Sequence, residues 1–406
     1  MATCRICDTP YEQFISFGDM PIANGFLRPE DFDQEYYFEM KVGFCTHCSM
    51  VQLLQQPERE RMFHEDYAFF SSLSKGQTIH FKKFADKLTR EYLTADDPFA
   101  VEIGSNDGIM LQNLASAGIR HLGIEPSENV AAVAREKGIN TVSSFFDEKL
   151  ATDIIEKHGH ADTISSANVI CHIPYIHSVL AGISSLLKPE GVFIYEDPYL
   201  GDIIEKVSYD QIYGEHVFYF SATSVSNMIA RHGLELFDVE HLDVHGGSMR
   251  YFIAKKGSRK ITDKVKTVLA DEERLGISRL ETYETLRHNI ENSRDRLVEL
   301  LNEVKAKQGS PVVAYGATSK STTVLNYCNI GPELIAFISD TTPLKQNKFS
   351  PGMHIPIQTP DEITKNRPSH MLLFAWNHMQ EIMNKETEYN DRGGKWIVYV
   401  PEVRVI

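Results

Sequence analysis

The sequence has few of the features that mark secreted, membrane-spanning or nucleic-acid-binding proteins. Its 406 residues contain only six cysteines and 17 prolines, which excludes a disulfide-stapled scaffold and a proline-rich disordered chain. No apolar run approaches the ~18 residues that span a bilayer, and the first residues lack the apolar segment of a secretion signal. Basic residues are outnumbered by acidic ones, 41 against 56, and the formal net charge of −15 argues against nonspecific binding to nucleic acid. We therefore expect a cytoplasmic protein without membrane or nucleic-acid partners.

Four of the six cysteines form two C-x-x-C pairs, Cys4 with Cys7 and Cys45 with Cys48. Each pair can place two thiolates on one metal ion, at about 2.3 Å from each sulfur. Four thiolates complete a tetrahedral shell, so no position is left for water or substrate. The cysteines therefore predict a structural Zn²⁺ in a small N-terminal module.

From residue 98 the sequence alternates between short apolar strands and amphipathic helices, which predicts a doubly wound parallel sheet. Two alternating segments at 234–244 and 249–254 predict an antiparallel pair at its edge. Residues 259–307 lack proline and indicate one or two long connecting helices. A second strand, glycine turn and helix start at residue 311 predicts a smaller Rossmann-like unit, so the expected fold class is α/β throughout.

A glycine-containing turn follows the first strand of the α/β region. Gly104 lets the backbone approach a cofactor, and Glu125 ends the next strand, where a carboxylate can hold a ribose diol. The turn lacks a third glycine for a pyrophosphate, and the carboxylates of Glu102 and Asp107 would repel a diphosphate but suit a sulfonium and an amino group. S-adenosylmethionine is therefore favoured over NAD, with a turn that serves packing alone as the alternative. The candidate cofactor-binding residues are Glu102, Gly104, Asn106, Asp107, Glu125, Phe145 and Asn168.

Two further segments carry groups that suit chemistry or anion binding. Tyr213, Glu215 and His216 lie within four residues, and each is a plausible proton-transfer group; a polar loop with aromatic anchors is the alternative. The strand, turn and helix start around Gly316 and Lys320 can form a phosphate cradle, although an ordinary capped helix is also possible. The segment from His245 to Arg250 indicates a tight hairpin turn that could also present these two side chains to a ligand.

Taken together, these motifs resemble those of the sugar C-methyltransferases that act on nucleotide-linked 4-keto-deoxysugars. The resemblance spans nearly the whole chain and also rests on the segments Met50–Leu53, Ala167–Val169 and Gly352–Pro356. It implies a zinc-binding module at residues 1–65, an S-adenosylmethionine-binding methyltransferase domain at 66–258, a helical connector at 259–308 and a Rossmann-like nucleotide-sugar-binding domain at 309–406. The candidate substrate-binding residues are Tyr67, His172, His245, Arg250, Gly316, Thr318, Ser319, Lys320, Asp340 and Lys345.

The implied reaction transfers a methyl group to a carbon next to the 4-keto group of a nucleotide-diphosphate sugar, with C3 favoured over C5. A base must first remove the acidic proton, and the resulting enolate then attacks the methyl sulfonium. His216 is the first choice of base because a neutral imidazole suits pH 7, with Tyr213 as the runner-up. Glu215 and Tyr213 would orient the base or polarise the ketone.

Two other classes of function stay open at this point: a nucleotide-sugar oxidoreductase that uses NAD, and a zinc-organised binding protein without catalysis. We expect a monomer.

Overall fold

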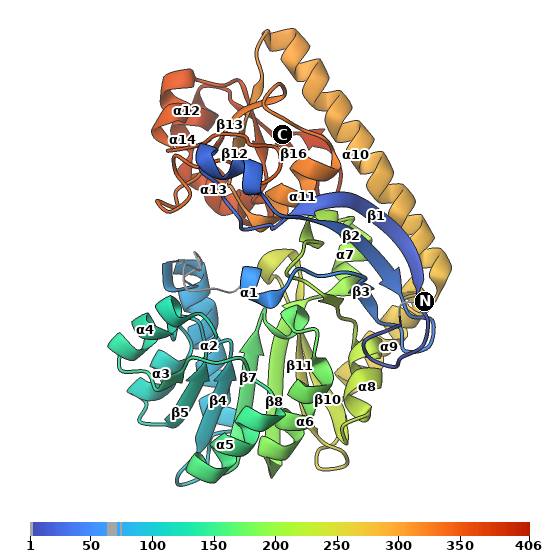
Figure 1. The fold of residues 1–406 in the computed structure, drawn as a ribbon, viewed down its shortest axis with the longest axis vertical. Coiled ribbons are helices and arrows are strands. Elements are labelled where there is room, and N and C mark those ends of the chain that lie inside the picture. The colour runs from blue at the N-terminus through green and yellow to red at the C-terminus, as the bar shows by residue number, and fades with distance from the viewer. Residues whose placement is uncertain (1–2, 63–70, 74) are drawn as a thin grey trace.

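The computed structural model describes residues 3–62, 71–73 and 75–406, and the strands among them form three sheets (Figure 1). The first sheet is antiparallel and has the strand order β1-β2-β3-β9. Its strands are β1 (Glu12–Pro21), β2 (Tyr37–Phe44), β3 (Val51–Leu53) and β9 (Phe218–Tyr219). The helical pieces between β1 and α2 (Lys75–Glu91) in the described ranges are the short helix α1 (Arg59–Met62) and the 3₁₀ helices Pro29–Gln34 and Ser71–Leu73. Because β9 comes from the middle of the chain, the N-terminal module shares its sheet with the segment that directly follows His216.

The second sheet is the doubly wound sheet that the sequence predicts, with the order β10-β11-β8-β7-β4-β5-β6. Its parallel strands are β4 (Phe99–Ile103), β5 (Arg120–Ile124), β6 (Thr141–Val142), β7 (Ala161–Ala167) and β8 (Leu187–Pro198). β10 (Leu234–Leu242) and β11 (Ser248–Lys255) form the expected antiparallel pair at the edge. The strand order reverses between β4 and β7, which is where open α/β sheets bind their ligands.

The helices of this central part are α2 (Lys75–Glu91), α3 (Leu111–Ser116), α4 (Glu128–Glu136), α5 (Glu148–His158), α6 (Ile176–Leu186), α7 (Leu200–Lys206) and α8 (Ala222–Ala230). Of these, α3, α4, α5 and α6 connect successive parallel strands as crossovers. The parallel strands are therefore covered by helices, and β4 is buried along its whole length.

Two helices, α9 (Asp263–Leu275) and α10 (Leu280–Gln308), lead to the C-terminal part, and α10 runs along one side of the molecule (Figure 1). The third sheet has the order β14-β13-β12-β15-β16-β17 and is parallel apart from β17. Its strands are β12 (Val312–Tyr315), β13 (Ile335–Ser339), β14 (Ile357–Gln358), β15 (His370–Leu373), β16 (Lys395–Val398) and β17 (Arg404–Val405). Its helices are α11 (Ser319–Tyr327), α12 (Asp361–Asn366), α13 (Met379–Lys385) and α14 (Thr387–Asp391).

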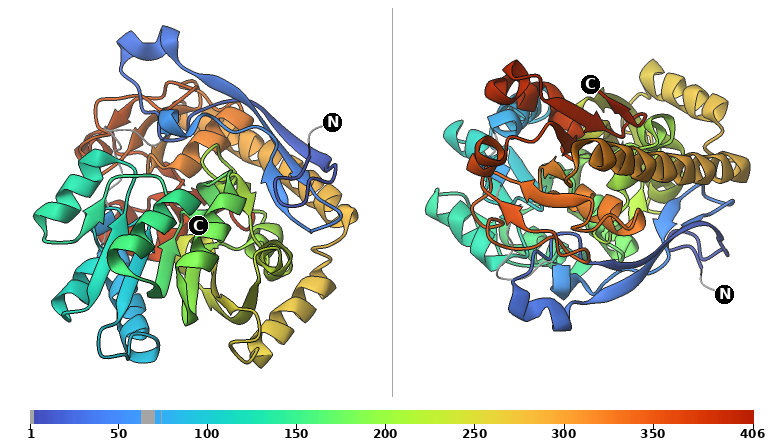
Figure 2. Two further views of the ribbon diagram at one scale, coloured as in Figure 1. Left: turned by 60° about the horizontal axis from the view of Figure 1, so that its bottom comes forward. Right: turned by 90° about the horizontal axis from the view of Figure 1, so that it is seen from above.

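The observed α/β architecture confirms the predicted fold class, while the boundaries at residues 65, 258 and 308 stay predictions. Figure 1 shows β1 beside α10, and both views of Figure 2 show the N-terminal strands along one outer side of the molecule, where β1 contacts α10 and α11. Within the described ranges, no helix combines the length and the apolar character needed to cross a bilayer.

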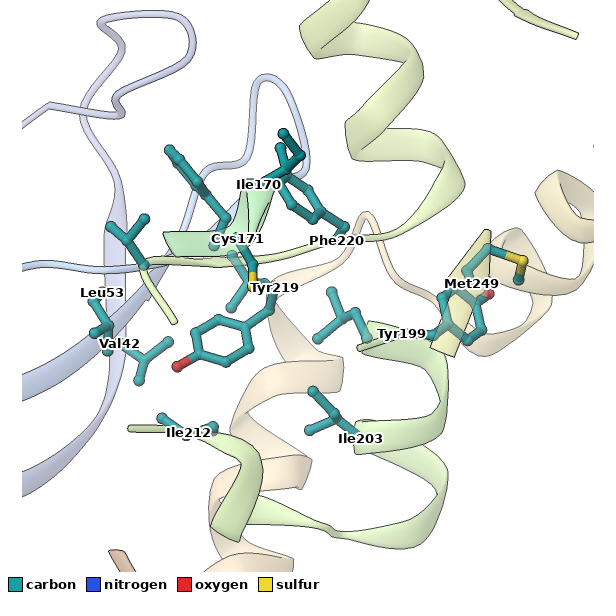
Figure 3. Close-up of a cluster of buried hydrophobic side chains, with 14 of the residues drawn as sticks. Val42, Leu53, Ile170, Cys171, Tyr199, Ile203, Ile212, Tyr219, Phe220 and Met249 are labelled. Carbon is teal, nitrogen blue, oxygen red and sulfur yellow. The ribbon is translucent and has the colours of Figure 1, made fainter. Parts of the chain in front are cut away.

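The N-terminal sheet is packed against the central part through a shared apolar core. Val42 and Leu53 from β2 and β3 lie in one buried cluster with Tyr219 of β9 and with Ile212, which precedes it (Figure 3). Polar contacts reinforce this packing at the two C-x-x-C turns, because His177 Nε2 donates to the carbonyl oxygen of Ile6 (3.1 Å) and Asn227 Nδ2 donates to that of Cys48 (3.1 Å). The module is therefore fixed against the central domain.

Candidate active site

The four predicted metal ligands meet at one point. The Sγ atoms of Cys4 and Cys48 are 3.5 Å apart, those of Cys7 and Cys45 are 3.4 Å apart, and all four lie within 4.8 Å of one another. A tetrahedral Zn²⁺ with sulfur ligands at ~2.3 Å needs sulfur–sulfur separations of about 3.8 Å, so this set fits zinc with small adjustments. Four cysteines fill the shell, and the ion they hold is therefore structural.

A cavity of about 340 Å³ lies where the three parts of the chain meet, beyond the carboxyl ends of β4, β5 and β7. It is lined by fourteen of the predicted site residues: Gly104, Asn106, Glu125, Phe145, Asn168, His172, Tyr213, Glu215, His216, His245, Thr318, Ser319, Lys320 and Lys345. Five predicted residues lie outside this lining: Glu102, Asp107, Arg250, Gly316 and Asp340. Tyr67 lies outside the described residues.

The cofactor side of the cavity is built on the turn after β4. Gly104 has a positive φ of 71°, and its amide and that of Ser105 donate to the carbonyl oxygen of Ile124 (2.7 and 3.1 Å). A Cβ at Gly104 would lie 2.3 Å from a methyl carbon of Val169, so only glycine fits. Glu125 Oε2 accepts the amide hydrogen of Asn106 (3.1 Å), which ties the turn to the end of β5.

The charge on this side suits a cationic ligand. Glu102 is buried, and among the described residues its Oε2 atom has no hydrogen-bond partner. Burial, together with the carboxylates of Glu125 and Asp107, raises the pKa of Glu102 well above its usual value. Of these three carboxyl groups only that of Glu125 lines the cavity, and Asp107 is already paired with Lys137 (3.1 Å). An end that is lined by one carboxyl group and backed by two more favours the sulfonium and amino groups of S-adenosylmethionine over a diphosphate.

Aromatic side chains cover the same end of the cavity. The guanidinium of Arg59, next to the cavity, lies 4.2 Å from the ring centroid of Phe145 and 5.1 Å from that of Tyr175. Phe145 was predicted for the cofactor site, whereas Arg59 and Tyr175 were not, because an isolated Arg or Tyr carries no signal of this kind. The three side chains form an apolar and cationic wall of the kind that contacts an adenine ring.

The cluster around His216 lies in the middle of the cavity. His216 Nδ1 donates to the backbone oxygen of Gln211 (3.0 Å), which leaves the lone pair on Nε2. The His216 ring lies 4.0 Å from that of Tyr213 and 5.1 Å from that of His172, measured between centroids. Burial is the main cause that holds the pKa of His216 well below its usual range and lowers that of His172 to about 4, so both rings are neutral near pH 7.

Burial raises the pKa of Glu215, whereas it lowers the pKa of the two histidines, because the neutral form of a carboxyl group is the protonated one. The pKa of Glu215 is raised to about 7, while a hydrogen bond from Asn24 and the charge of Lys345 act in the other direction. Asn24 belongs to the N-terminal module, and sequence reasoning missed it. A single Asn in a turn has no chemical signature, and its partner lies 191 residues away.

The opposite end of the cavity carries two partly buried lysines from the C-terminal part, Lys320 and Lys345. Lys320 Nζ donates to the carbonyl oxygen of His245 (3.0 Å) and lies 4.8 Å from the ring centroid of Trp376. Lys345 Nζ donates to the carbonyl oxygen of Ala317 (2.8 Å). Burial lowers the pKa of both lysines.

Gly316 and Asp340 support this end of the cavity without lining it, whereas Thr318 does both. Gly316 has a φ of 90°, and Asp340 Oδ2 accepts the amide hydrogen of Ala317 (2.7 Å), so both residues shape the turn after β12. Thr318 caps α11, because its Oγ1 accepts the amide hydrogen of Ser321 (3.2 Å). Thr318 therefore both caps α11 and lines the cavity.

Arg250 lies apart from the cavity, in β11. Its guanidinium donates to Glu196 (2.9 and 2.6 Å) and to Glu240 (3.1 Å), and it is almost fully buried. These contacts place it beneath the cavity as the counter-ion of Glu196. His245, predicted from the same segment, reaches the cavity lining.

Comparison with known proteins identifies the family to which the chain is related. Three family models match successive parts of the chain: a zinc binding domain at residues 4–63, a methyltransferase domain at 78–239 and a C-methyltransferase C-terminal domain at 243–401. The chain is 36% identical over 406 residues to the C-methyltransferase NovU of Streptomyces niveus, covering 99% of this chain and 96% of that protein.

Two more distant matches concern parts of the chain. Over 100 residues it is 30% identical to the ubiquinone biosynthesis O-methyltransferase of Methylococcus capsulatus, covering 24% of this chain and 41% of that one. The solved structure of magnesium protoporphyrin IX methyltransferase from Synechocystis with bound S-adenosylmethionine gives a TM-score of 0.35 at 13% identity, covering 45% of this chain and 80% of that one.

Proposed function

From the premise that this chain belongs to the C-methyltransferase family, we propose that it methylates a nucleotide-linked 4-keto-deoxysugar at a carbon next to the ketone. It is an S-adenosylmethionine-dependent C-methyltransferase with a structural zinc ion. The sugar-nucleotide part of this proposal is supported by a cavity whose two ends differ chemically. One end offers the carboxyl group of Glu125 and aromatic rings, and the other offers the ammonium groups of Lys320 and Lys345, which are partly buried.

The two lysines support an anionic substrate. Lys320 and Lys345 are partly buried, and each donates a hydrogen bond to a backbone oxygen. The nearest opposite charges are Asp210 for Lys320, and Asp340 and Glu215 for Lys345. Both ammonium groups line the cavity, where a further anion can meet them. The hydroxyl groups of Thr318 and Ser319 and the start of α11 lie at the same end. A nucleoside diphosphate matches this combination of charges and donors.

His216 is the proposed base. Its Nδ1 atom is occupied by the hydrogen bond to Gln211, so Nε2 is the atom that accepts the proton from the substrate carbon. Since this hydrogen bond already orients the ring, Glu215 is not needed for that purpose. Tyr213 is the second choice of base, and its ring is tilted by 36° from that of His216, with 4.0 Å between the ring centroids.

Glu215 is proposed to polarise the ketone as a carboxylic acid. With a pKa of about 7 it holds a proton in a large fraction of molecules at neutral pH. A protonated carboxyl in a buried site can donate a hydrogen bond to the ketone oxygen, where negative charge develops as the neighbouring proton leaves. When bound, S-adenosylmethionine supplies the electrophilic methyl group; the residues of this chain hold the two ligands, exclude water and move the proton.

A labelling experiment tests the proposal. The protein is incubated with S-adenosylmethionine carrying a ¹³C methyl group and with a panel of nucleoside-diphosphate 4-keto-6-deoxysugars, and the products are analysed by NMR. We expect a new methyl group on a carbon next to C4, with C3 as the first position to examine. The matched control is the same sugar nucleotide with its ketone reduced to an alcohol, which cannot acidify the neighbouring carbon and should not react. Methylation on oxygen, or equal turnover of the reduced sugar, would contradict the proposal.

A further inference from the structure

Asn24 joins three parts of the chain at the centre of the cavity. Its Nδ2 donates to Glu215 Oε1 (2.7 Å), and its Oδ1 accepts the hydroxyl hydrogen of Ser319 (2.9 Å). Asn24 follows β1 in the N-terminal module, Glu215 precedes β9, and Ser319 is the first residue of α11. Both ends of one amide are thus engaged, which leaves it little rotational freedom.

The backbone around Asn24 is held independently of its side chain. The amide of Gly25 donates to the carbonyl oxygen of Ile22 (3.0 Å), which closes a turn directly after β1. Thr322 Oγ1 donates to the carbonyl oxygen of Ala23 (2.9 Å), which anchors the turn to α11. Asn24 is therefore presented to the cavity by a fixed scaffold, and changing its side chain leaves these anchors intact.

We infer that Asn24 is a positioning residue for the reaction, supplied by the zinc module, which fixes the Glu215 carboxyl group relative to the C-terminal domain that holds the substrate. The inference rests on the proposed function, since it assumes that Glu215 acts on the ketone. Glu215 has a carboxyl group that can rotate, and only the oxygen that Asn24 leaves unbound can turn toward the substrate. Asn24 thus selects the reactive oxygen.

The same contact adjusts the acidity of Glu215. A neutral N–H donor stabilises the ionised carboxylate, so it offsets part of the effect of burial and keeps the pKa near neutrality. The other ionisable groups in the surroundings are Lys345 from the loop after β13, Tyr213 and His216 from the same loop as Glu215, and Cys171 and His172 after β7. Lys345 acts in the same direction as Asn24, whereas the two imidazoles are neutral near pH 7.

The pH dependence of turnover tests this inference. A reaction that needs protonated Glu215 loses activity as the pH rises through the pKa of Glu215. The plot of kcat against pH for the wild type should therefore fall on its alkaline side near pH 7, and this fall is called the alkaline limb. Asn24→Ala removes the donor, so the pKa of Glu215 should rise and the limb should move upward by roughly 0.5–1 pH unit. The pH-independent kcat should fall about tenfold because the carboxyl group is no longer oriented. Asn24→Asp has nearly the same shape but adds a negative charge, and it should move the limb further in the same direction.

The matched control is Thr322→Val, which removes one anchor of the same turn but keeps the turn's own hydrogen bond from Gly25 to Ile22 and the side chains of Asn24 and Glu215. It should keep the wild-type limb. If both Asn24 variants keep the wild-type limb, or if Thr322→Val shifts it equally, Asn24 has only a structural role and the inference is wrong. A limb that is absent from the wild type, or that survives in Glu215→Gln, would instead show that Glu215 does not act as an acid, and the failure would lie in the proposed function.

Discussion

Which nitrogen of His216 can accept a proton follows from one hydrogen bond. Because the carbonyl oxygen of Gln211 can only accept, Nδ1 carries the hydrogen and Nε2 is the basic atom. We predict that His216→Gln still binds both ligands but loses roughly 10²–10⁴-fold in kcat, the usual contribution of a positioned base. The variant should be compared with Tyr213→Phe under the same conditions.

Deuterium exchange separates the two candidate bases. With S-adenosylhomocysteine in place of the methyl donor, the wild type should exchange the proton next to the ketone of the substrate with D₂O, and His216→Gln should not. If His216→Gln exchanges at the wild-type rate while Tyr213→Phe does not, the phenol is the base. Full methylation by both variants would show that neither residue takes part.

The residues that could be predicted from sequence are those whose neighbours in the chain are also their partners in space. Glu125 comes at the end of a strand that follows a glycine turn, and the spacing itself carries the information. Asn24 has no such context, since its two partners lie 191 and 295 residues away. Only tertiary structure could place it beside Glu215.

At the level of secondary-structure elements, the zinc site is connected to the cavity by a short path. Cys48 is followed by β3, β3 pairs with β9, and β9 begins two residues after His216. Gln56, just beyond β3, donates to the backbone oxygens of His172 (3.2 Å) and Glu215 (3.4 Å). Loss of the metal should therefore disturb the catalytic loop as well as the module.

We predict that Cys45→Ser lowers zinc content, loosens the N-terminal module and reduces kcat by roughly 10–100-fold, while S-adenosylmethionine still binds. The central sheet should stay folded, because it has a second apolar core, with Phe84, Ile194 and Phe252 among its members, to which the N-terminal module contributes no residue. Zinc analysis, hydrogen exchange by mass spectrometry and calorimetric titration with the cofactor give the three measurements. Cys328→Ser is the control, because Cys328 is buried but lies outside the metal cluster. Full activity in a zinc-free Cys45→Ser protein would contradict the coupling.

Helices and strands with a clear hydrophobic pattern could be predicted from the sequence. Strands that form only because a distant segment pairs with them could not. The strands β4, β5 and β7 follow from apolar runs bounded by turns, and their helical connections fix the parallel order. The strand β9 has only two residues, and it exists because β3 offers it a partner. No local pattern predicts a strand of that kind.

At the scale of the whole molecule, the net charge of −15 works against an anionic substrate. The arrangement of the three parts offsets this charge locally, because it brings the ammonium groups of Lys320 and Lys345 together at one end of the cavity, while Glu125 lines the other end. The sequence could predict the two sheets that supply these ends, since each has its own alternation of strands and helices. It could not predict how the sheets face each other, because that depends on packing among α10, α11 and the N-terminal sheet.

The separation of charges yields a final prediction about the two ligands. Lys320→Ala should raise the KM for the nucleotide sugar by roughly 10–100-fold, the scale for losing one charged contact to a phosphate, and leave the affinity for S-adenosylmethionine unchanged. The variant should fold although Asp210, the buried carboxylate that faces Lys320, loses this neighbouring charge. Asp210 keeps its hydrogen bonds from Trp376 (2.6 Å) and Tyr399 (2.7 Å).

Lys365→Ala provides the control for this change, because it removes an equal charge from the surface of the same domain, where the side chain is 67% exposed. Steady-state kinetics with each ligand varied in turn should show a large effect on substrate KM for Lys320→Ala alone. A nonspecific effect of domain charge would appear in both variants. An effect of Lys320→Ala on the cofactor but not on the sugar nucleotide would mean that the ends of the cavity are assigned in reverse, because an ammonium group and a cluster of carboxyl groups cannot both favour the same charged ligand.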